Sequence, residues 1–216
     1  MKYYKNKPTG YYNNIRTEML DFLPPNSKKI LDVGCGQGSF ASVIKEMQGA
    51  EVWGIEYMES EAKVAATVLD KVFSGPCENA LDKLPDHYFD AIYFNDVLEH
   101  LVDPYAVLDI MKTKLSPNGV VISSIPNVRF FKTFLKVIFQ KDWKYEDYGI
   151  MDKTHLRFFT NKSIVRMYEE LGYEIIKHEP INKSKLLIPI IINIFMLFSQ
   201  MDIRVLQYAT VAKVKK

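Results

Sequence analysis

The chain has 216 residues, of which 48% are apolar and 13% aromatic, so it can bury a sizeable core and we expect one globular domain over 1–216. Its 28 basic and 26 acidic residues leave a net charge of +2, and no nucleic-acid partner is expected. Two cysteines, Cys35 and Cys77, make no disulfide framework, and the polar N-terminus lacks the apolar core of a signal peptide. We therefore expect a cytoplasmic protein.

Strand-like and helix-like segments alternate along most of the chain, as in a parallel sheet covered by helices. Asp103 followed by Pro104 is a typical helix start, and Gly172 is a typical helix stop. The expected strands are 28–34, 50–57, 71–75, 89–96, 119–126, 173–179 and 206–214, and the expected helices are 37–47, 59–69, 104–114 and 161–171.

Two segments depart from this alternation. Residues 128–159 are longer than an ordinary connection and include the helix candidate "RFFKTFLKVIFQK", so we expect a lid or pocket wall. Within 184–200, the run "LLIPIIINIFMLF" (186–198) is apolar on nearly every face but, at 13 residues, too short to span a bilayer alone. It is either a buried helix or a peripheral membrane or homodimer contact.

A glycine-rich stretch, "LDVGCGQGSF", leaves the first expected strand and enters the first expected helix. Its glycines, Gly34, Gly36 and Gly38, would let the backbone pass close to a ligand at the helix N-terminus. A dinucleotide fingerprint, G-x-G-x-x-G, would place its third glycine where Ser39 stands. The spacing therefore indicates a nucleoside-binding loop of another type, or an ordinary tight turn.

Two acids stand at the ends of the first two expected strands, beside this loop. Asp32 precedes the glycines, and Glu56 is placed where an adenosine ribose would present its hydroxyl groups. A carboxylate suits that task because its two oxygens can accept from two neighbouring hydroxyls. Capping of loop amides is the alternative role for both acids.

Taken in order, these motifs resemble the class I S-adenosylmethionine-dependent methyltransferases. The matching segments are "LDVGCGQG", "GIEY", "FDAIYFNDVLEHL" and "LSPNGVVISSIPN", and the resemblance covers about residues 28–180. It implies an α/β, Rossmann-like, mostly parallel seven-stranded sheet in the order 3-2-1-4-5-7-6. The last strand, "LQYATVAKV", would be antiparallel, with helices on both faces and a helical lid.

The resemblance also implies a cofactor site for S-adenosylmethionine. Relatives often carry an aspartate after strand three to recognise adenine, but Pro76 stands there, so the task falls to the backbone near Cys77, to Glu78 or to Asn79. Relatives often place a tyrosine of the N-terminal region, here 1–27, against the methionine moiety, although simple aromatic packing is the alternative. Tyr11, Tyr12 and Arg16 are the candidates in that region. The implied cofactor-binding residues are Asp32, Gly34, Cys35, Gly36, Glu56, Tyr57, Glu78, Asn79, Asn95 and Tyr12.

A second group of polar residues is expected at the carboxyl edge of the sheet, where open parallel sheets bind ligands. An alcohol acceptor must lose a proton, so a histidine base or a divalent ion that acidifies the hydroxyl would be useful there. The catalytic candidates are His155, His100 and Glu99. A set of Asp96, Glu99, His100 and His155 would suit Mg²⁺ or Mn²⁺.

These residues resemble the E-x-x-E-H motif of the small-RNA 2'-O-methyltransferases and the ubiquinone-pathway O-methyltransferases, with Asp96 in place of the first glutamate. "LEHL", "PNV" and "HLRFFT" together resemble methyltransferases of polysaccharide and cell-envelope biosynthesis, and this resemblance implies a sugar or sugar-derived metabolite as the acceptor. As alternatives, His155 and Arg157 pin the lid, and Asp152 pairs with Arg157 or forms a turn.

The sequence thus predicts a methyltransferase that acts on a hydroxyl of a sugar or small metabolite. An NAD-dependent oxidoreductase on a similar fold, or a non-catalytic membrane-associated partner protein, are the alternatives. The accepting atom could also be nitrogen or carbon.

Overall fold

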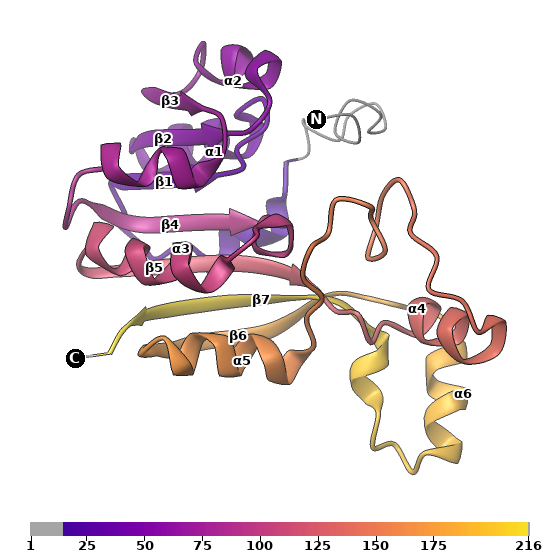
Figure 1. Ribbon diagram of the computed structural model, residues 1–216. Coiled ribbons are helices and arrows are strands. Elements are labelled where there is room, and N and C mark those ends of the chain that lie inside the picture. The colour runs from indigo at the N-terminus through magenta and orange to yellow at the C-terminus, as the bar shows by residue number, and fades with distance from the viewer. Residues whose placement is uncertain (1–14, 216) are drawn as a thin grey trace.

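The computed structural model describes residues 15–215, which form one seven-stranded sheet covered by helices (Figure 1). The strands are β1 (Lys29–Val33), β2 (Glu51–Glu56), β3 (Lys71–Ser74), β4 (Phe89–Asn95), β5 (Leu115–Pro126), β6 (Tyr173–Lys183) and β7 (Val205–Val214). Their order, β3-β2-β1-β4-β5-β7-β6, confirms the prediction. β7 is antiparallel to β5 and β6, and the other neighbouring pairs are parallel.

The helices follow the predicted alternation. Asp103 caps α3 by accepting from Ala106 N at 3.0 Å, and Gly172 takes a left-handed φ of 77° after α5. The α-helices are α1 (Ser39–Gln48), α2 (Glu59–Ala65), α3 (Pro104–Lys114), α4 (Phe131–Leu135), α5 (Asn161–Glu170) and α6 (Ile188–Phe195). Tighter or wider turns form η3 (Thr17–Phe22), η4 (Cys77–Asn79), η5 (Leu81–Lys83), η6 (Leu98–His100), η8 (Met201–Arg204) and the π-helix η7 (Lys136–Gln140).

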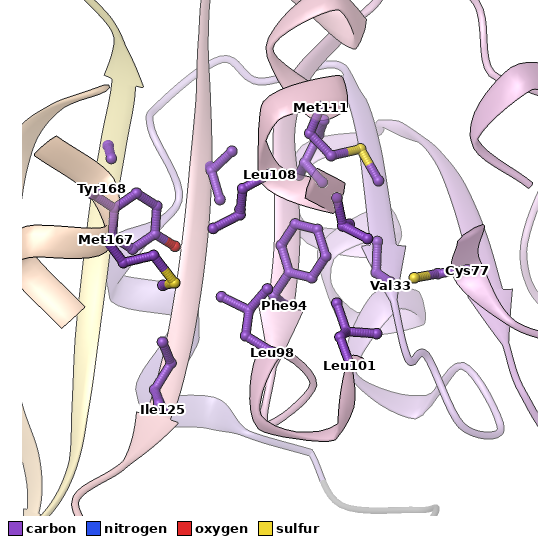
Figure 2. Packing of buried hydrophobic residues seen from close by; sticks show 14 of the residues in the cluster. Val33, Cys77, Phe94, Leu98, Leu101, Leu108, Met111, Ile125, Met167 and Tyr168 are labelled. Atoms are coloured by element: carbon purple, nitrogen blue, oxygen red, sulfur yellow. The ribbon is translucent and has the colours of Figure 1, made fainter. Parts of the chain in front are cut away.

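Alternating strand residues build one core on each face of the sheet. Leu31 and Phe94 pack with α3 and α5 on one face, whereas Ile30 and Tyr93 pack with α1 and η3 on the other. Figure 2 shows Phe94 among side chains of the first of these cores. This alternation follows from the two-residue period of a strand. It leaves the carboxyl ends of the parallel strands as the edge where loops meet.

β5 differs from its prediction, since it begins at Leu115 rather than at Gly119. The pairing of β4 with β5 shifts register between Phe89 and Ala91, which marks an irregularity at this point. A Cβ on Gly119 would lie 2.5 Å from the Phe89 carbonyl oxygen. The absence of a side chain at Gly119 therefore allows the close approach of the two strands.

The segments around the predicted lid depart further from expectation. The helix predicted over 129–141 forms as α4 and η7. The alternative that 186–198 forms a buried helix is wrong: in α6 only Pro189 and Asn193 are buried. Within 15–215, no helix is long and apolar enough to cross a membrane. In the N-terminal region the described helical segment is the short 3₁₀ helix η3, and the predicted Tyr11 and Tyr12 lie outside the described residues.

Candidate active site

The glycine loop joins β1 to α1 through residues with left-handed backbone geometry. Gly34, Gly36 and Gly38 have φ angles of 76°, 54° and 81°, which residues with a Cβ rarely adopt. At Gly34 the space is also closed, because a Cβ would lie 2.5 Å from Val97 Cγ2. The loop is therefore a turn that requires glycine, at a helix N-terminus where backbone amides can meet a ligand.

Glu56 links this loop to the end of β2. Its carboxylate oxygens accept from Gly36 N at 2.9 Å and from Met58 N at 2.7 Å. Glu56 therefore caps loop amides, which is the alternative role predicted for it. Burial raises the pKa of Glu56, and the two amides oppose that rise. Each oxygen has a second lone pair, so the same carboxylate retains the capacity to accept from two hydroxyls of a ligand.

Asp32 lies beside Glu56 and is only 2% exposed. Burial, and then the charge of Glu56, raise the pKa of Asp32 to about 8. Burial also raises the pKa of the neighbouring Cys35 thiol, as do the charges of both acids. Cys35 is therefore a packed thiol, and Asp32 is an acid whose charged form needs a cationic or hydrogen-bonding ligand.

Asn95 ends β4 at the same edge. Its amide nitrogen and oxygen are both inaccessible to solvent and have no hydrogen-bond partner among the residues that the structure describes. A buried amide normally has partners, so Asn95 is suited to a ligand that supplies them. In η4, which follows β3, Cys77 is buried and the side chains of Glu78 and Asn79 are exposed.

Asp96, the next residue, takes a left-handed φ of 55° and faces the N-terminal segment. Its carboxylate pairs with the buried guanidinium of Arg16 and accepts from Ser124 Oγ at 3.2 Å and from Gln207 Nε2 at 2.6 Å. Burial raises the pKa of Asp96, and the Arg16 charge opposes that rise. No sequence pattern links Ser124 or Gln207 to Asp96, because both residues stand on strands predicted without a role in the site.

Glu99, His100 and His155 come together where η6 meets the end of the lid. One ligand atom from each lies within 4.8 Å of the others, whereas Asp96, the fourth predicted metal ligand, is not part of this group. The two imidazole rings pack edge to face with centroids 4.6 Å apart, and His155 Nε2 is 3.9 Å from a Glu99 oxygen. Three of the four predicted ligands therefore meet.

Backbone carbonyls orient both imidazoles. His100 Nδ1 lies 3.0 Å from the Thr154 oxygen, and His155 Nδ1 lies 2.9 Å from the Ile150 oxygen. A carbonyl only accepts, so each Nδ1 carries the proton and each Nε2 carries the lone pair when the ring is neutral. Rings oriented in this way are typical of histidines that act as bases or metal ligands.

The Glu99 carboxyl group is the least satisfied member of this group. It is 1% exposed, and neither oxygen has a hydrogen-bond partner among residues 15–215. Burial raises the pKa of Glu99 well above its usual range, and the charges of Asp96 and Asp152 raise it further. Because an uncompensated buried carboxylate is costly, this geometry fits a group that takes up a proton or a cation.

The predicted lid, residues 128–159, contacts η6 and the turn after it through Arg157, one of the two residues expected to pin it. Arg157 N donates to the Glu99 carbonyl at 3.0 Å, and the Arg157 guanidinium donates to the Val102 carbonyl. Asp152 accepts from Thr154 N at 2.9 Å and from Thr154 Oγ1 at 2.8 Å, which forms the turn before His155. Asp152 and Arg157 thus hold the segment that carries the second histidine.

The sheet order, the glycine loop after β1 and the carboxylate at the end of β2 define the fold of the class I S-adenosylmethionine-dependent methyltransferases. Comparison with known proteins agrees. A family model described as a methyltransferase domain matches residues 9–178. This chain therefore belongs to the methyltransferase domain family, and it is an S-adenosylmethionine-dependent methyltransferase, which decides against the oxidoreductase alternative.

Individual relatives give the same class. A ubiquinone biosynthesis O-methyltransferase from Thiobacillus denitrificans is 31% identical over 176 residues, covering 78% of this chain and 74% of the relative. A protein of the same name from Chromobacterium violaceum is 29% identical over 175 residues, covering 77% and 73%. A crystal structure of a methyltransferase from Archaeoglobus fulgidus shares the fold, with a TM-score of 0.70 at 21% identity and 91% coverage of each chain.

Proposed function

We propose that this methyltransferase transfers a methyl group to a hydroxyl on a sugar or another small metabolite. The observation that carries the proposal is the group formed by buried Glu99, half-buried His100 and buried His155 at the edge of the sheet that also holds the glycine loop. The relatives' name, O-methyltransferase, supports oxygen as the accepting atom. Both cysteines are free and buried, which suits the cytoplasmic location that we also propose.

S-adenosylmethionine, when bound, supplies an electrophilic methyl group on a sulfonium whose departure leaves a neutral thioether. In this proposal Glu56 accepts from the ribose hydroxyls, and Asp32 and the loop backbone hold the methionine portion. The Asn95 amide, which finds no hydrogen-bond partner in the part of the chain that the structure describes, supports a place for this residue beside the amino-acid tail. The full proposed set is Asp32, Gly34, Cys35, Gly36, Glu56, Tyr57, Glu78, Asn79, Asn95 and Tyr12.

On the acceptor side, His155 is placed to receive the proton of the hydroxyl through Nε2. Its ring is fixed by the Ile150 carbonyl, and its turn is fixed by Asp152. Methyl transfer needs alignment of donor and nucleophile above all, so the lid from 128 to 159 serves as the wall that positions the acceptor. Removal of the hydroxyl proton during attack is the step that a base accelerates.

A divalent cation fits the same residues. Glu99 offers two oxygens that have no hydrogen-bond partner within the described residues, and His100 and His155 offer imidazoles oriented through Nδ1. Mg²⁺ or Mn²⁺ held there would acidify a hydroxyl bound beside it. The direct-base role of His155 and the metal role differ in their response to chelation.

Calorimetry with S-adenosylhomocysteine tests the cofactor site. The wild-type protein should bind it, Asp32→Ala should bind at least about tenfold more weakly, and NAD should not bind. A methyl-transfer assay should then compare sugars, nucleotide sugars and catechols as acceptors, with and without EDTA. Transfer to amines but to no hydroxyl compound would refute the proposed acceptor class. Activity that survives EDTA would leave His155 as the base and remove the metal.

A further inference from the structure

Most apolar side chains around α6 face outward instead of joining a core. Phe195 is 85% exposed and Leu197 is 87% exposed. Contiguous apolar surface of this kind is rare on a monomer that has no partner there. The exposed apolar residues of this segment, called here the apolar tip, are Leu186, Leu187, Ile188, Ile191, Ile194, Phe195, Met196, Leu197 and Phe198.

The apolar tip is held in place by its own hydrogen bonds. Asn193, which is fully buried, donates through Nδ2 to the Pro189 carbonyl at 2.8 Å and to the Gln200 carbonyl at 3.1 Å. Leu197 and Phe198 both adopt left-handed backbone geometry, with φ angles of 49° and 55°. Such strain in bulky residues persists where the surroundings impose it, and it gathers at functional surfaces. The fold thus builds this exposed turn.

A second apolar element lies beside the tip. Figure 1 shows α4 and α6 next to each other beyond the carboxyl edge of the sheet. Phe131 of α4 and Ile192 of α6 belong to one small core around Ile203. In η7, which continues α4, Ile138 and Phe139 are exposed. The two elements therefore form one packed unit with apolar side chains on its outside.

Lysines and exposed aromatic residues around α4, η7 and α6 indicate which partner binds this unit. Neither 129–141 nor 184–201 contains an acid, whereas Lys132, Lys141 and Lys185 stand in them with exposed side chains. The lid beyond η7 adds exposed Trp143 and Tyr148. Aliphatic side chains, lysines and amphipathic rings together match the apolar, anionic and interfacial layers of a bilayer surface.

We propose that the apolar tip and η7 dock this methyltransferase onto an anionic bilayer surface. The unit would lie in the interface without crossing it, because α6 spans only eight residues. A second copy is a poorer occupant, since a two-fold interface would bring together lysines of both copies, and neither 129–141 nor 184–201 offers an acid to pair with them. The lid carries both η7 and His155, so docking would place the acceptor side of the site toward the membrane. This proposal does not depend on the proposed acceptor.

Vesicle sedimentation with the full chain tests the proposal. The wild-type protein should bind vesicles of phosphatidylcholine with 30% phosphatidylglycerol, and bind pure phosphatidylcholine vesicles more weakly. F195S/L197S should weaken binding at least about tenfold, because both side chains leave the apolar layer. K132E/K185E should remove the preference for anionic vesicles and the sensitivity of binding to salt.

The matched control is Met47→Ser, which removes an apolar side chain of 65% exposure from α1 and should bind like the wild type. Retention of the wild-type protein in the supernatant with both vesicle types would overturn the proposal. So would a loss equal in F195S/L197S and Met47→Ser. A concentration-dependent dimer that F195S/L197S dissolves, in the absence of vesicle binding, would show that a second copy covers the tip.

Discussion

Arg16 and Asp96, 80 positions apart in the chain, meet as an ion pair at the carboxyl edge of the sheet. The Arg16 side chain is 10% exposed and that of Asp96 is 31% exposed. The guanidinium also donates to Ser124 Oγ and Gln207 Oε1, both at 3.3 Å. One arginine therefore ties the N-terminal segment to three strand ends next to the proposed site.

Arg16→Met should lower the free energy of unfolding by about 1–3 kcal/mol, a range discounted for the partial exposure of Asp96. Asp96→Asn should have a similar effect. The double variant R16M/D96N should be more stable than the two single effects predict, because neither charge is then left without its partner. Urea unfolding of the four proteins measures this coupling, and strictly additive effects would contradict a direct interaction.

Gly34→Ala should weaken S-adenosylhomocysteine binding at least about tenfold, because the new Cβ meets Val97 Cγ2 and the loop must shift. Gly149→Ala is the matched control. Gly149 has a φ of 83°, similar to that of Gly34, but no atom within 4 Å of an added Cβ. It should lose about 1 kcal/mol of stability from backbone strain and keep its affinity. If Gly34→Ala and Gly149→Ala lost the same affinity, the contact of the new Cβ with Val97 would not explain the weaker cofactor binding.

Asp32→Asn should stabilise the unliganded protein while weakening cofactor binding. Burial raises the pKa of Asp32 from 3.8 to about 8, so between these values the folded state holds a proton that the unfolded state has released. Stability therefore falls as pH rises through this window. The variant should gain about 1–3 kcal/mol over the wild type at pH 8 and less at pH 5, as measured by urea unfolding. An advantage that shrinks as pH rises would reverse the sign of this argument.

Most of the fold could be predicted from the sequence because local and global signals agree. Asp103 and Pro104 mark a helix start that the structure uses, and the alternation of Ile30 and Leu31 between two cores follows from strand geometry. β5 departs from its prediction because the irregular pairing near Gly119 depends on the Phe89 carbonyl of another strand. A single sequence does not contain that contact.

The site could be predicted only in part, for a similar reason. The meeting of Glu99, His100 and His155 follows from the rule that strand ends share one edge. The ion pair between Asp96 and Arg16 depends on how the N-terminal segment crosses that edge, which the sequence patterns do not reveal. The apolar composition of α6 suggests a buried helix, but most of its apolar side chains are exposed. The buried side chain of Asn193 holds the turn after α6 through hydrogen bonds with Pro189 and Gln200, and the apolar side chains lie on the outside.

Glu99→Gln tests the most costly group of the proposed site. Removing a buried charge should raise the stability of the unliganded protein by about 1–3 kcal/mol at pH 8, while methyl transfer falls at least about 100-fold.

If the group holds a cation, Mn²⁺ at 100 times its dissociation constant should stabilise the wild type by about 2.7 kcal/mol and leave Glu99→Gln and His155→Ala unchanged. Thermal unfolding with and without MnCl₂ measures this, with the exposed Glu46→Gln as the control. If Mn²⁺ still stabilised Glu99→Gln, the Glu99 carboxylate would not be a ligand of the ion, and the ion would bind elsewhere.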